Sequence, residues 1–191
     1  MPDAPAREVS MDLSAPRLCT RPFPPYRFVP GQQPHPTAHP QGHSYRAPGT
    51  PEARVQCVPP ERWMDSADYL YGVDLYNHGY WWEAHESWEG LWQLTDKSGV
   101  QGQFLQGLIQ CSACHLKWHM HQLDGVERLR ASSSTYLQFV IARSETSRYM
   151  GLDVLQYLLN FEGYYQRLLR YGAGDEGHDP AIYPYVVLER A

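Results

Sequence analysis

Fourteen of the sixteen prolines lie in the first 60 residues, and this distribution restricts the fold of the chain more than any other feature. Proline fixes its own φ angle, lacks an N–H donor and pushes the preceding residue out of the helical region. Residues 1–60 therefore cannot form a long helix. Apolar side chains are interspersed among the prolines, which predicts an extended arm partly docked on a folded domain: Phe23, Tyr26, Phe28, Val29 and Tyr45.

From Glu61 onward, apolar residues recur with the period of α-helices, and Gly, Asn and Asp stand where helices commonly end. The pattern predicts five helices, over about 62–77, 80–94, 100–121, 124–145 and 151–170. Short helix connections favour antiparallel neighbours. We therefore predict an all-α fold in which a compact antiparallel bundle at 61–172 follows the arm at 1–60 and precedes an extended C-terminal tail at 173–191.

The charge and hydropathy of the chain argue against two classes of partner. Residues 1–60 carry six Arg against four acids, whereas residues 61–191 carry ten basic residues against seventeen acidic ones. Nucleic acid requires a basic face, which this balance does not supply. The start of the chain lacks the pattern of a signal peptide, and no stretch approaches the roughly 18 apolar residues of a membrane span. We expect a cytoplasmic protein without nucleic-acid or membrane partners; a small molecule or a second copy, as a homodimer, is compatible with this composition.

The second predicted helix carries His85-x-x-x-Glu89-x-x-Trp92. At 100° per residue, four tryptophans share the side of His85: Trp81, Trp82, Trp88 and Trp92. The opposite side carries Glu83, Glu86, Ser87, Gly90 and Gln93. A tryptophan stripe normally faces a core, so we predict that His85 and Glu89 are buried neighbours. One imidazole N–H would then reach the carboxylate, and the other ring nitrogen would be free for a metal, a proton or a ligand.

Two interpretations of this pair stay open. In the first, His85 and Glu89 form a buried hydrogen-bonded pair that only orders the bundle. In the second, the pair is a functional site. Burying such a pair is often no more stabilising than apolar packing, and this favours the second interpretation.

Two segments around the motif match a family pattern in order. They are Leu75-Tyr76-Asn77-His78-Gly79-Tyr80-Trp81-Trp82-Glu83-Ala84-His85-Glu86, with Glu89 and Trp92, and then Phe104-Leu105-Gln106-Gly107-Leu108-Ile109-Gln110. This sequence resembles the domain of unknown function 309 family of bacteria and archaea, over about residues 67–170. The resemblance implies a small all-α domain and metal binding at the H-x-x-x-E-x-x-[WY] motif, whereas the function of the family is unassigned.

The resemblance also carries individual residues over. His85, Glu89 and Trp92 are the motif residues, and Asn77 matches the turn before them. Lys117 is a looser match, at a place where relatives carry basic residues. We therefore expect a pocket around His85 and Glu89 that is lined by Asn77, Trp81, Trp88, Trp92 and Lys117.

The third predicted helix contains Cys111-x-x-Cys114-His115, which fits the pattern for covalent haem attachment. Two features argue against haem: the chain shows no export signal, and the pentapeptide lies inside a long apolar helix. A redox or zinc C-x-x-C is the other alternative. Without a secretion signal, all four cysteines are expected to be reduced thiols, and these two to be small core residues: Cys19, Cys57, Cys111 and Cys114.

His115 and His119 stand one helical turn apart on this helix. If their face met the second helix, they would join His85 and Glu89 in a ligand set suited to zinc, manganese or iron. The alternative is that His119 only marks the polar end of the helix. The family pattern does not require histidine at either position.

The arm carries three histidines four residues apart: His35, His39 and His43. In an extended chain this spacing is about 13 Å, too far for one ion unless a turn intervenes. Solvated histidines are the favoured interpretation, and the alternative is that the arm folds over the helices and contributes a histidine to their groove.

Two functions follow as hypotheses. The first is a metal-dependent or acid/base hydrolase-like enzyme for a small molecule, with His85 and Glu89 as catalytic residues or ligands. The second is a non-catalytic binding or structural module, whose tryptophan-rich groove holds an apolar ligand or a partner helix.

Overall fold

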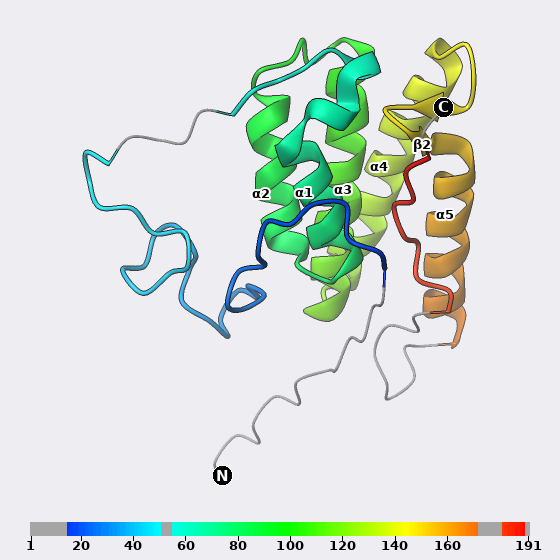
Figure 1. Cartoon of the computed structure of the whole chain (residues 1–191). Coiled ribbons are helices and arrows are strands. Elements are labelled where there is room, and N and C mark those ends of the chain that lie inside the picture. Colours follow the sequence, from blue (N-terminus) through cyan, green and yellow to red (C-terminus); the bar gives the residue numbers. More distant parts are fainter. Residues whose placement is uncertain (1–14, 51–54, 172–180, 190–191) are drawn as a thin grey trace.

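The computed structural model describes residues 15–50, 55–171 and 181–189 (Figure 1). Five α-helices pack against one another as a bundle, which confirms the predicted all-α class. Their bounds are Ala67–Asn77 (α1), Trp81–Trp92 (α2), Val100–His119 (α3), Leu123–Arg143 (α4) and Val154–Tyr171 (α5). No helix in these residues is long and apolar enough to cross a membrane.

The first helix begins later than predicted. Residues 60–65 form a separate 3-10 helix, Pro60–Asp65 (η1), in which Arg62 has non-helical angles (φ −101°, ψ 22°). Ser66 is extended, and α1 starts at Ala67. Pro60 is tolerated at the start of this 3-10 helix, where an N–H would be unpaired in any case, and the extended Ser66 separates η1 from α1.

A short hairpin is the one departure from the all-α prediction among the described residues. Arg148–Tyr149 (β1) pairs antiparallel with Leu152–Asp153 (β2), and the turn between them places Met150 and Gly151 at positive φ. Leu188 forms an antiparallel β-bridge with Leu152, so the C-terminal segment contacts this hairpin.

Close packing between α1 and α2 depends on one glycine. A Cβ atom built on Gly72 of α1 would lie 2.2 Å from Trp88 Nε1 of α2. Trp88 is fully buried, and its Nε1 donates a hydrogen bond to the carbonyl oxygen of Tyr69 at 3.3 Å. The indole therefore fills the space that a side chain at Gly72 would take.

The centre of the bundle is polar as well as aromatic. His115 of α3 is fully buried, with Nε2 2.7 Å from the hydroxyl of Tyr76 and Nδ1 2.8 Å from that of Tyr165. The hydroxyl of Tyr76 also lies 2.8 Å from that of Tyr157. Burial raises the pKa of these three tyrosines well above the usual value, so their hydroxyls keep their protons. Both ring nitrogens of His115 are thus engaged inside the core.

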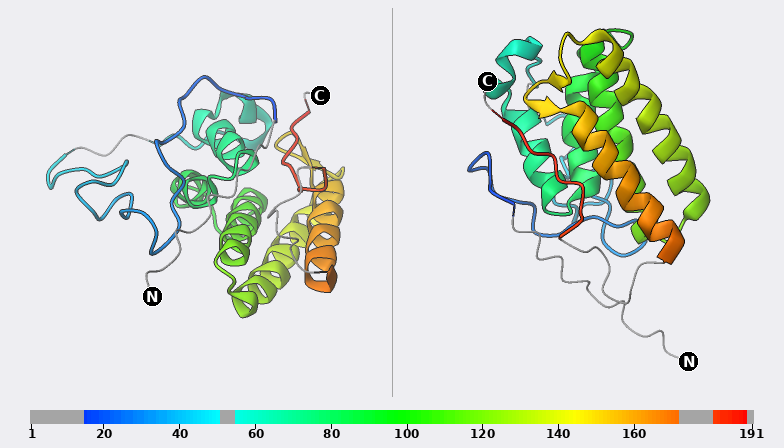
Figure 2. Two further views of the ribbon diagram at one scale, coloured as in Figure 1. Left: turned by 90° about the horizontal axis from the view of Figure 1, so that it is seen from below. Right: turned by 90° about the vertical axis from the view of Figure 1, so that its right-hand side faces the viewer.

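The arm crosses α1, and its residues 30–50 lie on the α2 side, where His35 and His43 contact Trp82 and Glu83 (Figures 1 and 2). Asp74 of α1, only 1% exposed, holds the start of the arm. Its carboxylate accepts hydrogen bonds from Arg17 Nε at 2.9 Å and from the backbone nitrogens of Leu18 and Cys19 at 2.7 and 3.1 Å. Residues 1–14 and 51–54 of the predicted arm lie outside the described part.

The C-terminal segment 181–189 runs beside α5 (Figures 1 and 2). Asn77, at the end of α1, binds it as a strand would: Nδ2 donates to the carbonyl oxygen of Val186 and Oδ1 accepts from its backbone nitrogen, both at 2.8 Å. Trp81 Nε1 donates to the hydroxyl of Tyr183 at 2.9 Å. Residues 173–180, 190 and 191 of the predicted tail lie outside the described part.

The anchoring role of Asp74 gives a first prediction. Asp74→Asn removes the charge that Arg17 and two backbone N–H groups contact, and hydrogen bonds to charged groups contribute about 1.5–3 kcal/mol. We expect trypsin to cleave after Arg17 and Arg27 about ten-fold faster, because cleavage follows the population of the released arm. The far-ultraviolet circular dichroism of the helices should not change. The surface variant Asp124→Asn is the matched control. If Asp74→Asn were cleaved no faster than this control, Asp74 would not hold the arm.

Candidate functional site

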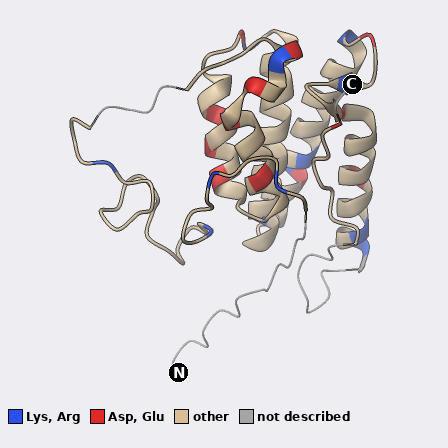
Figure 3. Cartoon of the chain, viewed as in Figure 1, with Lys and Arg blue, Asp and Glu red and all other residues tan. Residues whose placement is uncertain are grey.

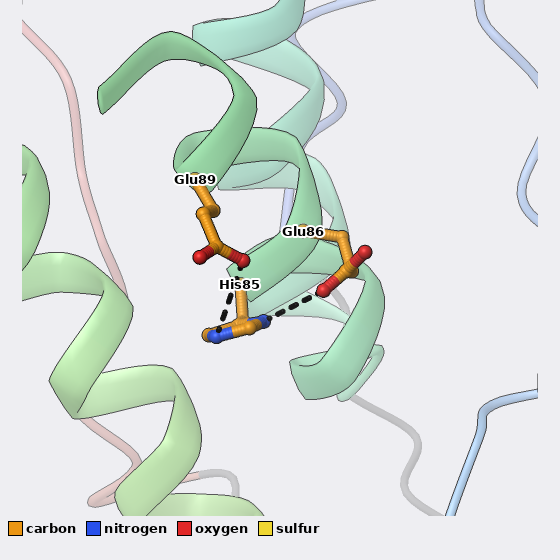
Figure 4. Close-up of side chains that lie close together, drawn as sticks. All are labelled: His85, Glu86 and Glu89. Carbon is orange, nitrogen blue, oxygen red and sulfur yellow. Dashed lines mark ion pairs between the residues drawn. The ribbon is translucent and has the colours of Figure 1, made fainter. Parts of the chain in front are cut away.

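His85, Glu86 and Glu89 gather on the surface of α2 (Figure 4). His85 Nδ1 lies 3.3 Å from Glu86 Oε1, and Nε2 lies 3.8 Å from Glu89 Oε2. Among the described residues, this is the one group of three or more His, Cys, Asp or Glu side chains with donor atoms all within 4.8 Å of one another. The motif thus brings one nitrogen and two carboxylate ligands together on a single helix.

The predicted burial of His85 and Glu89 is wrong. Their side chains are 30% and 37% exposed. The face of α2 that enters the core is centred elsewhere on the wheel, on Trp81, Ala84, Trp88 and Leu91. Trp82 and Trp92 are only half-buried, so the four tryptophans spread over a wide arc instead of marking one stripe. His85 and Glu89 lie at the edge of that arc, where solvent reaches them.

The predicted hydrogen bond between His85 and Glu89 is also missing, because 3.8 Å is too long for one. His85 Nδ1 approaches Glu86 as an ion pair but has no partner in hydrogen-bond geometry among the described residues, although this atom is itself buried. The imidazole therefore lies between two carboxylates without a hydrogen bond to either. This arrangement does not match the interpretation of a silent, hydrogen-bonded core pair.

His115 and His119 do not join the cluster. His115 lies in the core with both ring nitrogens on tyrosine hydroxyls. His119 is half-buried near the end of α3, with its ring centroid 5.8 Å from that of Trp81. Burial lowers its pKa, and the neighbouring His121 and Arg27 act in the same direction. The four-ligand set that the sequence offered as one alternative is not assembled.

The expected pocket residues are also dispersed. Trp81 and Trp88 are buried in the core, and Asn77 binds the C-terminal segment. Trp92 is half-buried, with the Lys97 ammonium 4.4 Å from its ring centroid. Lys117 donates to Gln122 Oε1 at 2.6 Å, at the far end of α3. These five residues therefore do not enclose one cavity.

Cys111 and Cys114 are both buried inside α3. Burial raises the pKa of each thiol to about 12, so both are protonated at neutral pH. Haem attachment, redox exchange and zinc binding all need a reactive or ligating sulfur, and the thiolate is the form that binds metal. The two side chains fill space in the core, next to the tyrosines that contact His115.

The buried carboxylate of α2 is Glu83, which was expected to face away from the core. Its side chain is 4% exposed, and its Oε1 accepts from the backbone nitrogen of Phe28 at 2.9 Å and lies 3.0 Å from His43 Nε2. Burial raises the pKa of Glu83, whereas the contact with His43 lowers it. The alternative in which the arm contributes a histidine to the helices therefore holds for His43, at Glu83 and not at His85. No local pattern indicates this, because both partners are at least 40 residues away.

Residues 69–129 match the model of a family described as a domain of unknown function (DUF309). This match supports the resemblance to the DUF309 family that the motif predicts. It runs from α1 through α2 and α3 into the first part of α4, and it contains His85, Glu86 and Glu89. No curated protein and no solved structure shows detectable similarity to the chain. The matched helices also pack against the arm, α5 and the C-terminal segment, which all lie outside the matched residues.

Proposed function

We propose that the family-matched part of the chain binds a divalent metal ion through His85 Nε2 and Glu89, with Glu86 on the Nδ1 side of the imidazole. The observation that supports this proposal is the accessible cluster of one imidazole and two carboxylates, in which neither ring nitrogen makes a hydrogen bond to another described residue. A histidine that ligates through one nitrogen commonly donates its other N–H to a carboxylate, and Glu86 is placed for that role.

The distances suit an ion with little movement of the side chains. Nitrogen and oxygen ligands lie about 2.0–2.2 Å from zinc, so two of them at the tetrahedral angle are about 3.4 Å apart. The separation of 3.8 Å between His85 Nε2 and Glu89 Oε2 is close to that spacing. One nitrogen with carboxylate oxygens is a donor set for zinc, manganese or iron, and a site with so few protein ligands leaves coordination positions open.

The open positions favour a hydrolase-like activity on a small molecule. A bound divalent ion would supply Lewis acidity and lower the pKa of a bound water. The chain itself would hold the ion with His85 and Glu89, and Glu86 would keep the proton on Nδ1 of the imidazole. Because the cluster is about one-third exposed, a substrate can reach it without opening the bundle.

The alternative of a tryptophan-rich groove for an apolar ligand or a partner helix has less support. Trp81 and Trp88, which would line that groove, are 3% and 0% exposed. A ligand would have to displace core packing to reach them, and interiors of proteins are close-packed.

Calorimetric titration of the full chain with Zn²⁺ and with Mn²⁺ tests the metal site. We expect one equivalent to bind, and His85→Ala and Glu89→Gln each to weaken binding about ten-fold or more. Glu86→Gln should weaken it less, because it only orients the imidazole. His39→Ala and Glu127→Gln, which change an exposed histidine and an exposed acid elsewhere, should bind as the wild type does. Absence of binding to the wild type, or unaltered binding by His85→Ala, would refute the proposal.

A further inference from the structure

A second feature lies apart from His85 and Glu89. The arm, α1 and α2 surround a pocket of about 690 Å³, here called the arm pocket. Its volume lies within the range of about 300–1,000 Å³ that small-molecule sites usually have. Neither His85 nor Glu89 lines it, and Glu86 is the one residue that it shares with the His85 cluster.

The two sides of the arm pocket carry opposite charge. The arm side contributes Arg21, His43 and Arg46, whereas the helix side contributes Asp68 of α1 and Glu83 and Glu86 of α2. Figure 3 shows the same division, with acidic segments on the helices and basic segments on the arm. A ligand with a single charge would be attracted to one side and repelled by the other.

The helix side contains an acceptor that lacks a donor. Glu83 is 4% exposed, and its Oε1 takes both contacts from the arm, with Phe28 and His43. Its Oε2 has no hydrogen-bond partner among the described residues. A buried carboxylate oxygen without a donor is costly, and Glu83 lines the pocket, so its Oε2 is the group in this wall that a partner with N–H groups would satisfy. The ring of Trp82 lines the same pocket and suits an ammonium group, which is attracted to aromatic faces, whereas the ring of Tyr71 already carries the Arg21 guanidinium, 4.2 Å from its centroid.

The arm side supplies two guanidinium groups at the pocket, those of Arg21 and Arg46. Arg21 pairs with Asp68 at 3.1 Å, but the side chains are 58% and 29% exposed, so this ion pair is weak. Arg46 is exposed at the rim. Guanidinium groups bind carboxylates through two parallel hydrogen bonds, which makes Arg21 and Arg46 suitable for the anionic end of a ligand.

We propose that the arm pocket binds a dipeptide-sized zwitterion, with its ammonium group at Glu83 Oε2 and its carboxylate at Arg21 and Arg46. Both charged sides are then complemented at once, and the orphaned oxygen of Glu83 gains a donor. Because the arm forms one side, the site exists only while the arm is docked on α1 and α2.

Three matched compounds test this by calorimetric titration of the full chain in the presence of EDTA. Alanyl-alanine carries both charges, its C-terminal amide carries only the positive one, and its N-acetyl derivative carries only the negative one. We expect alanyl-alanine to bind about ten-fold more tightly than either derivative, since each derivative lacks one ionic contact. Three results would each overturn the proposal. The amide could bind as tightly as alanyl-alanine or more tightly, the acetyl derivative could do so, or alanyl-alanine could fail to bind.

Two variants assign the ends of the ligand. Glu83→Gln should weaken alanyl-alanine binding about ten-fold but leave binding of the acetyl derivative unaffected. Arg46→Gln should likewise weaken alanyl-alanine binding about ten-fold but leave binding of the amide unaffected. Gln keeps an acceptor for the backbone of Phe28, and tryptic cleavage after Arg27 checks that the arm stays docked. Arg46 is exposed, so its variant should fold even if Glu83→Gln does not. The matched controls Glu127→Gln and Arg128→Gln lie on α4 and should bind normally. Because EDTA removes metal, failure of this site and failure of the metal site are separate results.

Discussion

Gly72→Ala is expected to lower the free energy of unfolding by about 2–3 kcal/mol, the upper part of the usual range for overpacked cores. The new Cβ would lie 2.2 Å from Nε1 of Trp88, whose indole is fully buried and hydrogen-bonded to Tyr69. Since the indole has no free space to enter, α1 and α2 must separate. For a chain of this size the melting temperature should fall by about 2–4 °C per kcal/mol, measurable by circular dichroism.

Gly163→Ala is the matched control for this prediction. Gly163 lies inside α5, and a Cβ built on it meets nothing within 4 Å. Alanine is the better helix former by about 1 kcal/mol, so this variant should be as stable as the wild type or more so. If both variants behaved alike, close contact between Gly72 and Trp88 would not be a feature of the folded protein.

His115→Phe is expected to destabilise the protein by about 3 kcal/mol, because buried hydroxyls that lose a partner cost about 1–3 kcal/mol each. The hydroxyls of Tyr76 and Tyr165 both contact the imidazole, at 2.7 and 2.8 Å. Phenylalanine fills most of the same space but offers neither nitrogen. Chemical denaturation with urea measures the difference, and stability equal to the wild type would contradict it.

A double-mutant cycle separates lost hydrogen bonds from altered packing. Tyr165→Phe alone removes the hydroxyl on Nδ1 of His115, and in the His115→Phe background it removes a hydroxyl that already lacks that partner. The double variant should therefore lose less stability than the sum of the single variants, by about 1 kcal/mol or more. Additive losses would mean that the two groups do not interact.

The helices could be predicted from the sequence because their apolar period is local. On α4, buried side chains recur with that period, at Val126, Ser133, Leu137 and Val140. The start of α1 could not be placed as well, because the apolar pattern does not distinguish the 3-10 helix Pro60–Asp65 from the first part of an α-helix.

The candidate site was predicted in its residues but not in its setting. The motif supplied His85 and Glu89, whereas their exposure depends on which side of α2 meets α1 and α3. Tryptophan does not decide this, because its large ring covers the edge of a helix as readily as the centre. Glu83 was assigned to solvent for a related reason: the groups that bury it, Phe28 and His43, are 55 and 40 residues away in an arm without regular structure.

Helices α1 and α2 bind both the arm and the C-terminal segment, and this limits how the chain can be truncated. Asp74 and Glu83 hold residues of the arm, and Asn77 holds Val186. His115, inside the family-matched residues 69–129, depends on Tyr165 outside them. The family-matched part of the chain therefore relies on contacts with segments that lie outside it. Excised alone, it would bring three polar anchors and the partner face of α5 into water, with no segment left to cover them.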